Sequence, residues 1–115
     1  MSYDIRICVK AEGCDAYPTI AEPAYSSPTY NLGTMFRKCM DWDYNQVEYY
    51  KCAFVITRVE HGLKELKNNR DKYLQYNPEN GWGDIDGAIS VLTSLRQCIY
   101  ETAETVPIHC LYMHW

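Results

Sequence analysis

The chain has 115 residues and a net charge of −4, and 47% of its residues are hydrophobic and 23% charged. These values predict one globular domain spanning residues 1–115. The negative charge argues against direct binding of duplex nucleic acid, which requires a basic surface that displaces counterions. The sequence has no signal-peptide layout and no apolar run near the ~20 residues of a membrane span. We therefore expect a cytoplasmic protein that does not associate with membranes.

Six cysteines are scattered along the sequence, and none belongs to a C-x-x-C pair. In a chain without an export signal, this usage is typical of reduced thiols that pack as small hydrophobic residues. The cysteines and three histidines also lack the spacings of standard zinc sites. We therefore expect neither a metal nor a cofactor.

The first predicted element is a half-buried strand at residues 3–10, where Ile5, Ile7 and Val9 alternate with polar residues. Prolines recur through residues 17–28, which predicts a long loop across 11–30 with a short second strand around 16–21.

Apolar spacing then predicts two helices. The first covers 29–42, with Asn31 as its N-cap. The second covers 45–75, and the Asn68–Asn69 pair is a point where it could divide into two.

The clearest helical pattern covers 84–104, with Asp84 at its N-terminus. Residues 107–115 alternate again and predict a strand that pairs with 3–10. The predicted fold is therefore α+β, a small sheet from the N- and C-terminal strands packed with two to four helices.

The segment NPENGWGDIDG, residues 77–87, precedes this helix. It does not match a calcium loop, because Trp82 and Thr93 would occupy ligand positions. Its glycine spacing does not match a phosphate loop, and Asp84 and Asp86 would repel phosphate. We interpret it as a turn between helices, with Trp82 plugging the gap and facing the core.

Tyrosine and tryptophan are abundant, with eleven and three copies. Many lie near acidic residues, and such rings provide large contact areas with polar edges, as recognition surfaces do. Packing between helices explains the same rings equally well. The candidate binding residues are Trp42, Asp43, Tyr44, Tyr49, Tyr50, Tyr73, Tyr76, Asn80 and Trp82.

Three motifs stand out after residue 28: Thr-x-Asn-Leu-Gly-x-Met at 29–35, Gly-Leu-x-x-Leu at 62–66, and Asn-Pro-x-Asn-Gly-Trp-Gly at 77–83. Together they resemble a small uncharacterised family associated with phages and prophages. The chain departs from that family in its cysteine content and in segment 17–28. The resemblance implies a phage-linked context in the host cell cytoplasm, where small acidic, aromatic-rich proteins often inhibit host defences.

These observations favour a non-enzymatic binding protein that inhibits a host defence component such as a CRISPR effector, in the manner of an anti-CRISPR protein. The expected partner is a host protein, and a homo-oligomer is a further expectation. Two alternatives stay open: a sponge that sequesters a signalling nucleotide, and a small enzyme with a Cys–His site. The sequence contains no G-x-S-x-G or H-E-x-x-H motif that would favour the enzyme.

Overall fold

The computed structural model describes residues 2–13, 15–45, 48–81 and 83–115. These residues form an α+β domain around a four-stranded antiparallel sheet, as the sequence predicts. The strands are β1 (Arg6–Val9), β2 (Thr19–Ala21), β3 (Tyr49–Lys51) and β4 (Leu111–His114). Their order across the sheet is β2-β1-β4-β3, so the two terminal strands lie side by side at its centre.

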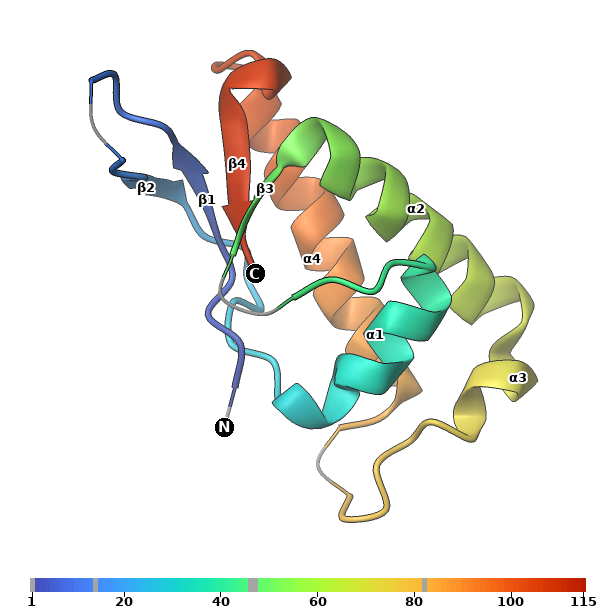
Figure 1. Ribbon diagram of the computed structural model, residues 1–115. Helices are drawn as coiled ribbons and strands as arrows, with labels where there is room; N and C mark the ends of the chain where they lie inside the picture. Colours follow the sequence, from blue (N-terminus) through green and yellow to red (C-terminus); the bar gives the residue numbers. More distant parts are fainter. Residues whose placement is uncertain (1, 14, 46–47, 82) are drawn as a thin grey trace.

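Four α-helices are present in the described chain: α1 (Gly33–Met40), α2 (Cys52–Asn68), α3 (Arg70–Leu74) and α4 (Ile85–Ala103). Short 3-10 turns precede α1 and β4, at η1 (Tyr30–Leu32) and η2 (Ile108–Cys110). Figure 1 shows α1, α2 and α4 grouped on one side of the sheet, with α3 beyond the end of α2. None of the helices in the described ranges has both the length and the apolar character needed to cross a bilayer.

The predicted pairing of the terminal strands is confirmed. Ile7 lies opposite Met113 and Val9 opposite Leu111, so their side chains project from the same face of the sheet. Ile7, Met113 and Leu111 are fully buried beneath the helices. The apolar positions of the alternation in both terminal segments therefore form the inner face of one small sheet.

The prediction of a helix across 45–75 is wrong at its start. Tyr49–Lys51 form the edge strand β3, with Tyr49 opposite His114 and Lys51 opposite Tyr112, and α2 begins at Cys52. Paired tyrosines favour a strand when a neighbouring strand offers backbone partners. The break at Asn69 is confirmed, since α2 ends at Asn68 and α3 starts at Arg70.

Two further boundaries differ from the prediction. Thr29, not Asn31, caps the first helical segment, because its hydroxyl accepts a hydrogen bond from the Asn31 backbone N–H at 3.2 Å. The C-terminal strand starts at Leu111, because η2 occupies the positions before it. The alternation of apolar and polar residues across 107–115 did not distinguish η2 from the strand that follows it.

The turn between α3 and α4 caps the second of these helices. Asp84 Oδ1 accepts a hydrogen bond from the Gly87 N–H at 2.7 Å, which confirms the predicted N-cap. Asn77 Oδ1 accepts a second one from the Ile85 N–H at 3.1 Å. Gly83 has φ +107°, and a Cβ there would lie 3.0 Å from Leu32. The segment is therefore a capped joint packed against η1, while Trp82 and its predicted place in the core lie outside the described residues.

Asp84 offers a direct test of this cap. Asp84→Ala should lower the free energy of unfolding by about 1 kcal/mol, because the Gly87 N–H loses its acceptor. Asp84→Asn keeps a side-chain oxygen and should change stability by only a few tenths of that value. Urea unfolding of both variants gives the measurement, and equal losses in the two would contradict the role as a cap.

The cysteine packing provides a second test. Cys8, Cys39, Cys52 and Cys98 are buried with free thiols, whereas Cys110 is exposed. Burial raises the pKa of Cys39 and Cys52 to about 12, so few thiolates exist there near neutral pH.

A brief treatment with iodoacetamide at pH 8 should therefore modify Cys110 but leave Cys39 and Cys52 unmodified until the chain is unfolded in urea. Mass spectrometry of the peptides distinguishes the sites. Modification of Cys39 at the rate of Cys110 would show that the core opens locally.

Candidate binding surface

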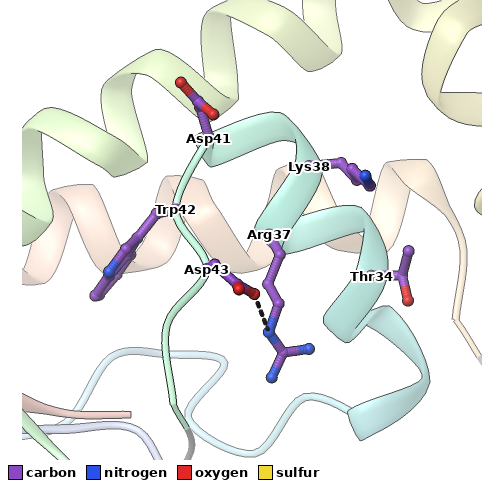
Figure 2. A pocket seen from close by; sticks show the side chains of 6 residues that line it. All are labelled: Thr34, Arg37, Lys38, Asp41, Trp42 and Asp43. Carbon is purple, nitrogen blue, oxygen red and sulfur yellow. Dashed lines mark ion pairs between the residues drawn. The ribbon is translucent and has the colours of Figure 1, made fainter.

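A hollow of 560 Å³ lies beside the C-terminal half of α1 and the segment that follows it. Its walls combine basic, acidic and aromatic side chains (Figure 2). The lining residues are Thr34, Arg37, Lys38, Asp41, Trp42 and Asp43.

The end of α1 creates this arrangement. Asp41 adopts left-handed backbone angles of φ 49° and ψ 50°, which its short polar side chain tolerates. The backbone N–H of Trp42 then donates to the Arg37 carbonyl at 3.1 Å, and that of Asp41 to the Lys38 carbonyl at 3.3 Å. The chain reverses within two residues, so Asp43 comes back towards Arg37, while the Asp41 carboxylate points away from both basic side chains (Figure 2).

Arg37 is held firmly in this wall. Its Nε donates to the Tyr44 carbonyl at 3.3 Å, and its guanidinium carbon lies 4.4 Å from the centroid of the Tyr44 ring. A Cβ at position 33 would lie 2.9 Å from an Arg37 nitrogen, so Gly33 leaves room for the guanidinium above the helix. Asp43 contributes little to holding it, because its exposed carboxylate is 3.9 Å away.

Trp42 connects the hollow to the core. The centroid of its half-buried ring lies 4.8 Å from that of Tyr50, 5.2 Å from Tyr44 and 5.3 Å from Phe54. Phe54 is 47% exposed, so the cluster continues to the surface on the α2 side. Trp42 and Arg37 therefore both line the hollow, and each packs against Tyr44.

Below Arg37, the hydroxyls of Tyr3 and Tyr44 form a buried hydrogen bond of 2.7 Å. Burial and the bond to Tyr3 raise the pKa of Tyr44, so its phenol stays neutral. Within the described ranges, no group of three or more His, Cys, Asp and Glu side chains is placed to hold a metal ion. The chemistry that this surface offers is hydrogen bonding, ion pairing and aromatic contact.

The structure brings together four of the nine predicted binding residues. Trp42 and Asp43 line the hollow, while Tyr44 and Tyr50 pack behind them. Tyr49, although adjacent to Tyr50, projects from the opposite face of the sheet and stacks on Tyr17.

Three further predicted residues lie in α3 or in the segment that follows it. Tyr73 is buried, and its hydroxyl donates to Glu65 at 3.2 Å. Tyr76 is half-buried and Asn80 is exposed in the following turn, while Trp82 falls outside the described residues. These rings pack α3 against the domain and do not extend the hollow.

Four lining residues were not predicted: Thr34, Arg37, Lys38 and Asp41. Their spacing of three and four residues marks the polar face of α1, opposite its apolar stripe. That pattern was visible in the sequence, but a polar helix face is ordinarily only solvated. The chain reversal at Asp41 turns this face into one side of a hollow.

Comparison of the chain with protein-family models, with curated proteins and with solved structures finds no match. The resemblance to a phage-associated family therefore stays a prediction from the sequence motifs.

The buried tyrosines predict a loss of stability in base. Burial, aided by the hydrogen bond to Glu65, raises the pKa of Tyr73 to about 12. The unfolded phenol has a pKa near 10, so above that pH the unfolded state loses a proton that the native state keeps. The stability that Tyr73 contributes is complete below pH 10 and declines above it, by about 1 kcal/mol between pH 10 and 11.

Urea unfolding between pH 9 and 11 measures this decline. Tyr73→Phe keeps the ring and removes the titrating group, so its stability should fall less steeply than that of the wild type. Parallel curves for the two proteins would contradict the assignment.

Proposed function

We propose that this protein is a non-enzymatic binding protein that engages a host protein through the hollow beside α1. The observation that carries the proposal is that a half-buried Trp42 and an Arg37 held against Tyr44 line the same hollow. Tryptophan and arginine dominate the energetics of protein interfaces, particularly where their side chains are already immobilised.

The charges around this pair favour a protein partner over a nucleic-acid backbone. Two basic residues, Arg37 and Lys38, and two acidic residues, Asp41 and Asp43, line the hollow, so its formal charge is balanced and it can accept a partner surface of mixed charge. Exposed charges of both signs are typical of the rim of a protein interface, where they set orientation and specificity.

The motif resemblance favours a particular partner class, a host defence component such as a CRISPR effector. An inhibitor of this kind needs no chemistry of its own, since occupying a functional surface of the effector is sufficient. The net charge of −4 suits a partner with a basic nucleic-acid groove.

A phage plating assay tests this function. Expression of the protein in bacteria whose CRISPR effector restricts a phage should restore plaque formation, and the purified protein should bind that effector in calorimetry. The charge reversal Lys38→Glu with Asp43→Lys should weaken binding about tenfold or more, because it alters two rim charges without changing net charge.

The matched control is Lys67→Glu with Asp71→Lys, an equivalent reversal at exposed positions of α2 and α3. It should bind like the wild type. Failure to restore plating or to bind any of a panel of effectors would overturn the inhibitor proposal. A rise in melting temperature with cyclic dinucleotides would instead favour the nucleotide sponge.

A further inference from the structure

We infer that the sheet face turned away from the helices binds single-stranded nucleic acid. This inference concerns a different surface from the hollow beside α1 and does not depend on the proposed function.

The strand register defines the residues of this face. Because Ile7 and Met113 project into the core, their neighbours along each strand project outward. Directly opposed residues share a face, so the register places seven strand residues on the outer side. They are Arg6, Cys8, Thr19, Tyr49, Lys51, Tyr112 and His114.

Aromatic rings cover the centre of this face. Tyr17, which precedes β2, stacks on Tyr49 with a centroid distance of 4.0 Å and an interplanar angle of 13°. Tyr112 meets the Tyr17 ring edge-on at 5.5 Å, and His114 meets Tyr49 at 5.1 Å. Cys8 on this face is completely buried, whereas Tyr49 remains 38% exposed. The result is a layer of rings across the sheet that is partly open to solvent.

Three cationic residues border the rings. Lys10 Nζ lies 6.0 Å from the centroid of Tyr17, and Lys51 is exposed at the register position opposite Tyr112. Arg6 is opposite His114 and pairs with Asp4 at 3.2 Å. Two lysines and the Asp4-paired Arg6 therefore lie beside the aromatic rings.

Acidic residues limit the path that phosphates could follow. Glu12 and Asp15 lie in the turn between β1 and β2, beside Lys10. A bound strand would therefore pass on the sheet side of Lys10, towards Lys51 and Arg6, and keep its phosphates away from Glu12 and Asp15.

Tyrosine faces with neighbouring lysine and arginine match the chemistry of single strands. Unpaired bases can stack on aromatic rings, while cations neutralise the phosphates. A duplex hides the faces of its bases and offers only its backbone to such a sheet, for which three cations are too few. A proline-rich peptide could use the rings but would leave the lysines without partners.

Fluorescence anisotropy with labelled ten-nucleotide DNA and RNA oligomers and a matched duplex tests the inference. We expect binding of the single strands and weaker binding of the duplex. The logarithm of the binding constant should fall with the logarithm of salt concentration with a slope of about −2, since each of three cations contributes about −0.7 on single strands.

Lys10→Glu with Lys51→Glu should weaken binding of the single strands by about tenfold or more. Its matched control, Lys64→Glu with Lys67→Glu, makes the same charge change at exposed positions of α2 and should have a smaller effect. Tyr49→Leu should also weaken binding by about tenfold, with circular dichroism showing that the fold is kept.

Equal loss in the two double variants would show that net charge alone determines binding, and it would overturn the inference. So would a preference for the duplex, no binding at low salt, or binding of a proline-rich peptide in place of the oligomers.

Discussion

The antiparallel pairing of β1 with β4 joins the two ends of the chain, and the rest of the fold depends on it. It places Trp115, which is 1% exposed, against the rings of Tyr3 and Phe36 at centroid distances of 5.9 Å. Contacts between residues so distant in sequence have a high loop-closure cost, which only a large buried surface offsets. Trp115 is the largest fully buried side chain among the described residues, so it contributes to that buried surface.

The same cluster fixes the segment that leads from α1 to the sheet. The centroid of the Trp115 ring lies 5.0 Å from that of Tyr44 and 6.0 Å from that of Trp42. The backbone N–H of Trp115 donates to the Glu48 carbonyl at 3.1 Å. Because Tyr44 in turn supports Arg37, the wall of the hollow is connected to the terminal strands through tilted and edge-on rings. The surface is therefore part of the rigid domain, which lowers the entropy cost of binding.

Helices α1, α2 and α4 meet at Gly62. A Cβ at Gly62 of α2 would lie 2.8 Å from Met40 and 3.2 Å from both Cys39 and Leu92, so α1 and α4 approach α2 at one glycine. The Gly-Leu-x-x-Leu motif singled out in the sequence thus has a packing role: Leu63 and Leu66 are buried beside it. Likewise, the Asn-Pro-x-Asn-Gly-Trp-Gly motif caps α4 through the Asn77 side chain and allows the Gly83 backbone to pass close to η1.

Sequence periodicity by itself determined the α+β class, the pairing of the terminal strands, the break at Asn69 and the cap at Asp84, because each follows from local spacing or capping chemistry. Only the tertiary structure decided that residues 49–51 form β3 and that Tyr49 and Tyr50 project from opposite faces of the sheet. Residues 49–51 became a strand because β4 offers backbone partners, and neighbours in a strand project to opposite faces. The hollow depends likewise on the chain reversal at Asp41, which brings Asp43 back towards the polar face of α1 and leaves no periodic trace in the sequence.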